Sequence, residues 1–237
     1  MHEKFQRLGN LADISEAISV LQQAVQLSAN GHSDDLTLAS LNNLGVAFGC
    51  RFEHMGDLSD LTEAISAKQR ALQLTPDGHP HMPLMLNNLG CSFQSRFARM
   101  GDLSDLTEAI SAMQCAVQLT TDSHPDMPSW LSNLGCSFQS RFDRMGDLSD
   151  ITEAISAKQR AVQLTPDGHP NMPLMLTNLG NSFQSRFACM GDFANRNTAI
   201  GLYKTAAITI GPPSARLKAA RNWANLPTKL NDPAVTW

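Results

Sequence analysis

The stretch LNNLGCSFQSRFARMGDLSDLTEAIS, residues 86–111, returns almost unchanged as LSNLGCSFQSRFDRMGDLSDITEAIS at residues 131–156. Residues 56–100 match residues 146–190 at 39 of 45 positions. The glycines of these segments recur every 45 residues, at Gly45, Gly90, Gly135 and Gly180 and at Gly56, Gly101, Gly146 and Gly191. A fixed period of this length is typical of proteins built from repeated structural units, each packed against its neighbours.

Each period predicts two helices. Apolar residues follow a helical spacing from Leu61 to Leu72, and the prolines and glycine of TPDGHP end that pattern. Asp60 and Glu63 have the D-x-x-E spacing of a capping box, so we expect this helix to begin near Asp60. The next helix is predicted from Met82-Pro83 to the turn glycine Gly101. No window alternates as a strand does, and the predicted class is all-α.

One helical hairpin cannot bury its own apolar face, whereas stacked hairpins cover one another. The sequence therefore predicts a right-handed α-solenoid that forms a single array over residues 1–237. The predicted units are residues 1–35 (partial), 36–80, 81–125, 126–170, 171–213 and 214–237 (a partial helix or linker).

Composition excludes several classes of partner. The 237 residues are 42% hydrophobic and 17% charged with a net charge of −4, so nucleic acid and anionic membrane are not expected partners. No apolar run reaches the roughly 20 residues of a membrane span, and the first residues lack the apolar core of a signal peptide. The cysteine count is odd and contains no C-x-x-C, which favours free thiols and a cytoplasmic location.

The repeat resembles the tetratricopeptide repeat. Leu41, Leu44, Gly45 and Phe48 fit the first helix of that family's signature, and Ala64, Ala71 and Pro76 fit the second. The sequence departs from the family where an aromatic is usual in the second helix, because Lys68, Met113 and Lys158 stand there and only Tyr203 restores the ring.

The sequence of the repeat resembles two groups of tetratricopeptide proteins more closely. LNNLG resembles the repeats of kinesin light chains, and the whole 45-residue unit resembles the repeat arms of fungal proteins that carry a caspase-like CHAT domain. The resemblance implies a non-catalytic scaffold that binds a protein or peptide. The alternative is a regulatory or sensor arm detached from a CHAT-type protease.

In tetratricopeptide arrays the first helix of each unit lines a concave groove. By that resemblance the groove residues are Asn43, Asn88, Asn133, Asn178, Asn87, Ser132, Gln94, Gln139 and Gln184. A primary amide offers a donor and an acceptor together, so this ladder of amides can pair with a peptide backbone. It can equally join adjacent helices. None of these positions holds Lys or Arg, and the groove is expected to be neutral.

Two further polar sets recur. Arg51, Arg96, Arg141 and Arg186 are each followed six residues later by Asp57, Asp102, Asp147 and Asp192, which predicts a structural ion pair at the corner or, alternatively, a ligand-binding arginine row. His32, His79, His124 and His169 are expected to be turn residues because copies in different repeats cannot converge on one metal ion. No catalytic motif or cofactor signature occurs, so no enzymatic activity, metal or cofactor is expected.

Overall fold

The computed structural model describes residues 11–29 and 34–226, and every regular element in these ranges is an α-helix. The helices are α2 (Leu11–Ala29), α3 (Asp34–Met55), α4 (Leu58–Leu74), α5 (Met82–Met100), α6 (Leu103–Gln118), α7 (Met127–Met145), α8 (Leu148–Leu164), α9 (Met172–Met190), α10 (Phe193–Ile208) and α11 (Pro213–Ala224). The all-α prediction is confirmed.

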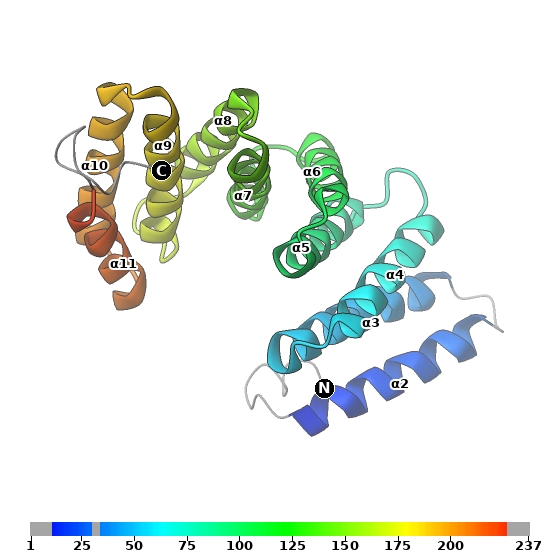
Figure 1. The fold of residues 1–237 in the computed structure, drawn as a ribbon. Helices are drawn as coiled ribbons and strands as arrows, with labels where there is room; N and C mark the ends of the chain where they lie inside the picture. The colour runs from blue at the N-terminus through cyan, green and yellow to red at the C-terminus, as the bar shows by residue number, and fades with distance from the viewer. Residues whose placement is uncertain (1–10, 30–33, 227–237) are drawn as a thin grey trace. The chain divides into compact units, whose positions relative to one another are not determined.

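Consecutive helices pack as hairpins within two compact units, residues 1–119 and 120–237. In the first unit α3 pairs with α4 and α5 with α6, and α2 packs on α3 (Figure 1). In the second unit α7 pairs with α8 and α9 with α10, and α11 packs on both α10 and α9. Stacked hairpins of this kind are the building blocks of an α-solenoid; the right-handed sense of the array stays a prediction.

Small and apolar residues form the interior of each hairpin. Ala109 and Ala116 of α6 are fully buried. Leu89 and Phe93 of α5 are buried in one cluster with Ala109. The equivalent alanines of α4, α8 and α10 are buried to the same degree. The helical spacing in the sequence therefore identifies the core face of both helices correctly.

The predicted capping residue is wrong by three positions. α4 begins at Leu58, and its N-cap is Asp57, whose carboxylate accepts from the backbone N–H of Ser59 at 2.9 Å. Asp102, Asp147 and Asp192 cap α6, α8 and α10 in the same way. The hydrogen bonds from Ser59 lower the pKa of Asp57 below its ordinary value. Asp60 is instead buried, 1% exposed, in the first turn.

The predicted arginine pairs are correct in kind but wrong in partner. Arg96 binds the buried Asp105, nine residues later, with Nη2 2.6 Å from Oδ1 and Nε 3.0 Å from Oδ2. Arg51–Asp60 and Arg141–Asp150 repeat this pair, and Arg186 binds Asn195. The predicted partner, the aspartate six residues after each arginine, instead accepts a backbone N–H at the start of the next helix. Each of these arginines also lies over the phenylalanine three residues before it, at 5.1–5.5 Å.

The other predicted corner features are confirmed. Gly101 ends α5 at φ 74°, as Gly146 ends α7 at φ 72°. The ring Nδ1 of His79, His124 and His169 accepts from the backbone N–H two residues later, at 3.1–3.2 Å, which is a turn role. His32 lies outside the described residues. The five cysteines are free thiols. In the described part of the chain no helix is long and apolar enough to cross a bilayer.

Candidate peptide-binding surface

The amide ladder lies on the first helix of each hairpin, as the sequence predicts, but its members differ in exposure. Asn43 on α3 is exposed, whereas Asn88, Asn133 and Asn178 on α5, α7 and α9 are half-buried. Asn87 is buried, at 6% exposed, so its side chain is the least available of the predicted groove residues. Ser132, Gln94, Gln139 and Gln184 are half-buried. The structure thus divides the predicted set into accessible amides and amides used between helices.

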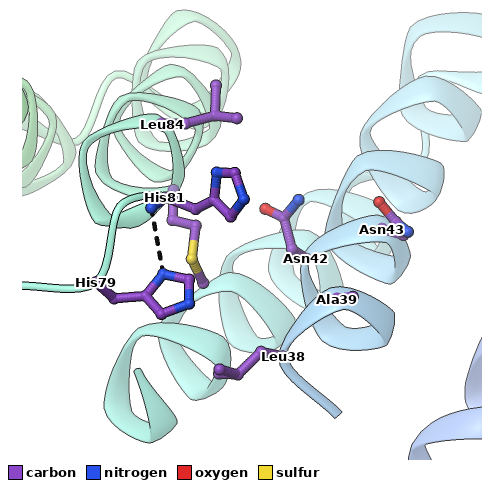
Figure 2. Close-up of a pocket in the computed structure, with 8 residues that line it drawn as sticks. Leu38, Ala39, Asn42, Asn43, His79, His81 and Leu84 are labelled. Carbon is purple, nitrogen blue, oxygen red and sulfur yellow. Dashed lines mark hydrogen bonds between the residues drawn. The ribbon is translucent and has the colours of Figure 1, made fainter. Parts of the chain in front are cut away.

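A cavity of about 470 Å³ opens between α3 and the start of α5 (Figure 2). Its lining combines apolar Leu38, Ala39, Leu84 and Met85 with polar Asn42, Asn43, His79 and His81. Figure 2 shows the Asn42 amide directed toward the ring of His81. Asn42 Oδ1 is buried and accepts no hydrogen bond from the described residues. Because Asn42 Oδ1 is not open to solvent, the exposed Asn43 is the lining amide that offers a ligand its donor and acceptor.

A second cavity, of about 220 Å³, lies between α3 and α5 above Lys68 of α4. It is lined by residues that include Gly49 and Cys50 of α3 and Asn88, Cys91 and Ser92 of α5. Lys68 comes from the second helix of its hairpin, whereas the predicted groove positions, all on first helices, hold no Lys or Arg. Glu53 also lines this cavity, so its lining contains one cation and one anion. That the groove is neutral stays a prediction.

Lys68 reaches the cavity by passing under Gly45. A Cβ atom at Gly45 would lie 2.6 Å from Lys68 Cγ, so only glycine leaves room for the lysine stem. Lys68 Nζ then donates to Ser92 Oγ at 2.6 Å and to the backbone carbonyl of Asn88 at 3.2 Å. Burial lowers the pKa of Lys68 from 10.5 to about 8. The signal for this residue was present in the sequence: a lysine between two fully buried alanines of the helix stripe.

Lys158 repeats this arrangement in the second unit, where a glutamine joins the serine that it binds. Its Nζ donates to Ser182 Oγ at 2.8 Å, and that hydroxyl donates to Gln139 Oε1 at 2.6 Å. Gln139 Nε2 donates in turn to Asp143 at 2.9 Å. Burial lowers the pKa of Lys158, and the nearby Asp143 opposes that shift. Gln139 therefore joins α7 to α9, which is the inter-helix role that the sequence left open.

The last hairpin uses a tyrosine in the same place. Tyr203 is fully buried under Gly180, and its hydroxyl lies 2.8 Å from both Asn181 Oδ1 and Gln184 Oε1. Burial raises the pKa of Tyr203. Asn222 of α11 donates to Asn181 at 2.9 Å. Gln184 therefore acts within the fold, next to the side of α9 on which α11 packs.

Metal binding finds no support in the side chains that the structure describes, since no three of their His, Cys, Asp or Glu groups converge. The two adjacent histidines, His79 and His81, lie with ring centroids 5.5 Å apart and a tilt of 53°. His79 Nδ1 is already used by the backbone N–H of His81. Their position at the rim of the larger cavity suits hydrogen bonding to a ligand.

Comparisons with known proteins agree with this architecture. Residues 37–81 match the model of the tetratricopeptide repeat family. The chain is similar to the nearly identical TPR-like repeats of a putative kinesin light chain from Podosopora anserina, at 15% identity over 87% of this chain and 92% of that chain, with a TM-score of 0.62. It is also similar to BtubC (BKLC) from P. vanneervenii, at 16% identity over 96% of this chain and 80% of that chain, with a TM-score of 0.62.

A third similar structure is YrrB, described as a TPR protein with an unusual peptide-binding site, at 15% identity over 89% of this chain and 87% of that chain, with a TM-score of 0.51. A search of curated proteins finds no match. At these identities the likeness concerns the fold alone. Residues 37–81 are thus similar to a tetratricopeptide repeat, and the chain shares its fold with these helical-repeat proteins.

Proposed function

We propose that this protein is a non-catalytic scaffold that binds a peptide segment of a partner protein along the first helices of its repeats. The observation that carries the proposal is the cavity of about 470 Å³ that is lined by Asn42 and by Asn43, whose exposed amide offers both a donor and an acceptor. A peptide backbone supplies N–H and C=O groups at regular spacing, and it can pair with such an amide. Neither the lining of the larger cavity nor the amide ladder contains paired catalytic carboxylates or an activated nucleophile.

The exposed and half-buried amides support the same function. Asn43, Asn88, Asn133 and Asn178 occupy one position of the repeat, so each presents its donor and acceptor from the equivalent place on its own helix. Tetratricopeptide proteins generally act through protein or peptide partners, and YrrB is described as having a peptide-binding site. The alternative of a detached arm of a CHAT-type protease has no support in these comparisons. A cytoplasmic location remains part of the proposal.

The test is peptide selection followed by calorimetry. A displayed random-peptide library is selected on the full chain, and a selected peptide is titrated into wild type and into the triple variant Asn88→Ala, Asn133→Ala, Asn178→Ala. Each lost amide hydrogen bond costs roughly 0.5–1.5 kcal/mol, so the triple variant should bind about 10- to 1,000-fold more weakly.

The chain offers a matched control. Gln69, Gln114 and Gln159 are exposed amides at one repeated position of the second helices α4, α6 and α8. Changing these three to Ala removes as many amides from another face and should leave the dissociation constant within about twofold. Melting temperature is followed for both variants. Equal binding by wild type and the asparagine variant, with the fold intact, would refute the ladder as the binding surface.

A further inference from the structure

The two buried lysines differ in the side chains that surround the serine hydroxyl. In the second unit the hydroxyl of Ser182 accepts from Lys158 and donates to Gln139 Oε1 at 2.6 Å. In the first unit Ser92 accepts from Lys68, and its hydroxyl lies 3.3 Å from the carbonyl of Asn88 in its own helix. The residue equivalent to Gln139 is Gly49. The first site therefore lacks the side-chain oxygen that completes the second.

The space for that oxygen is open. A Cβ atom at Gly49 would meet nothing within 4 Å, and Gly49 lines the cavity of about 220 Å³ together with Lys68 and Ser92. A cavity of this volume accommodates a carboxylate with the first carbons of its side chain, and a polar group at its base fixes the orientation.

The charge on Lys68 favours a negatively charged oxygen in this cavity. Among the described residues no carboxylate forms an ion pair with Lys68, although the side chain is only 7% exposed. An ammonium has three N–H donors, and two of them are used by Ser92 and Asn88. The thiols of Cys50 and Cys91 adjoin the cavity, and Glu53 lines it without being among the charges that act on the pKa of Lys68. A buried cation in this state is stabilised by an incoming anion.

We propose that the Gly49 pocket, meaning the cavity bounded by Gly49, Lys68 and Ser92, binds a carboxylate of the partner peptide. This deepens the proposed peptide-binding function and rests on it. One carboxylate oxygen takes the place that Gln139 Oε1 holds in the second unit, accepting from Lys68 Nζ and the Ser92 hydroxyl. The carboxylate belongs to an acidic side chain or to a free C-terminus, which share this chemistry.

The experiment observes Lys68 directly and needs no partner. Full-length protein is labelled with ¹³C-lysine, and the Cε signal of Lys68 is assigned by its loss in Lys68→Met. The probes are N-acetylaspartate N′-methylamide for the side-chain source and N-acetylglycine for the C-terminal source, with N-acetylasparagine N′-methylamide as the neutral control. We expect a saturable shift of the Lys68 signal by at least one carboxylate, with a dissociation constant on the order of millimolar.

The variants come from the chain's own repeats. Gly49→Gln introduces the residue that stands at this position in the other three repeats, and it should weaken carboxylate binding at least about 10-fold by filling the pocket. Lys158→Met, which alters the site already filled by Gln139, should leave binding at Lys68 within about twofold. Raising the pH from 7 to 9.5 should weaken binding at least about 10-fold, because Lys68, with a pKa of about 8, loses its charge.

The probes also separate the two sources and the two proposals. A shift by the aspartate compound alone assigns an acidic side chain, and a shift by N-acetylglycine alone assigns a C-terminus. The pocket proposal is overturned if neither carboxylate moves the Lys68 signal, if the asparagine compound binds equally well, or if Gly49→Gln binds as wild type does. In each of those cases a selected peptide that still depends on the asparagine ladder would leave the scaffold function standing. If the pocket binds a carboxylate but no selected peptide depends on the asparagine ladder, the pocket proposal stands and the ladder is refuted as the binding surface.

Discussion

Replacing Lys68 with Met should stabilise the protein at neutral pH. Met113 holds the equivalent place under Gly90, with its Cγ 2.7 Å from a Cβ built there, so a methionine fits the space. Ser92 keeps the carbonyl of Asn88 as an acceptor when the lysine is removed, so no hydroxyl is left unpaired. The substitution therefore removes a buried charge and adds no cavity.

The expected gain follows from the pKa of Lys68, which burial lowers from 10.5 to about 8. One pKa unit corresponds to about 1.4 kcal/mol, so the ammonium costs about 3 kcal/mol more to bury than the neutral amine. The two hydrogen bonds lost with Lys68 offset part of this, at about 1 kcal/mol each. At pH 7 the variant should gain about 1–2 kcal/mol in free energy of unfolding.

The sign of the pH dependence gives a second measurement. The folded pKa lies below the unfolded value, so the cost of the buried charge is fully present below pH 8, declines as pH rises and is gone above pH 10.5. Wild type should therefore gain stability relative to Lys68→Met between pH 8 and 10. Urea unfolding followed by circular dichroism at pH 7, 8.5 and 9.5 checks both effects. A variant less stable than wild type at pH 7, or a stability difference that does not change up to pH 9.5, would refute the reasoning.

Three other substitutions test the corners and the packing. Asp105→Ala leaves Arg96 without its buried partner and should lower the free energy of unfolding by about 2–3 kcal/mol, whereas Asp105→Asn should cost less because Asn195 already serves Arg186; equal losses in urea unfolding would contradict this. Asp147→Ala removes an N-cap and should lower the melting temperature at pH 7 more than Asp167→Ala in the loop does, and because the folded pKa of Asp147 is lowered, that deficit should shrink as pH falls below 3.8. Gly135→Ala places a Cβ 2.7 Å from Lys158 Cγ and should destabilise by about 1–3 kcal/mol, while Gly201→Ala, with open space around it, should stabilise by about 0.5–1 kcal/mol; melting curves that rank the two the other way would disprove the packing argument.

The fold could be predicted from the sequence because repetition removes ambiguity. An apolar stripe, a turn glycine and a capping aspartate that recur at one spacing must satisfy the same packing each time. The helix predicted to begin around Met82-Pro83 and to end before the turn glycine Gly101 is α5, Met82–Met100, for this reason. The capping residue was wrong because Asp57 and Asp60 both suit an N-terminus, and only the position of the first helical turn decides between them.

The site was harder to predict because it depends on how helices meet. Asn43 and Asn87 look alike as exposed groove residues in the sequence, yet one is exposed and the other buried. Lys68 looked like a departure from the family's aromatic, and its position between Ala64 and Ala71 in the apolar stripe was its one sign of burial. Its role depends on the length of its stem, on the absence of a side chain at Gly45, and on the hydroxyl that the next hairpin places within reach.

In each hairpin a glycine of the first helix faces one side chain of the second helix. Gly45, Gly90, Gly135 and Gly180 face Lys68, Met113, Lys158 and Tyr203 in turn. A Cβ atom built at each glycine would lie 2.6–2.7 Å from the side chain that it faces, so this one position holds a charged, an apolar or an aromatic side chain at the same close approach. A single codon change in a second helix can then rewrite the chemistry offered by the neighbouring first helices. Duplication of such a unit adds a further position of this kind at the same 45-residue spacing. Each new position can then acquire its own side chain by mutation.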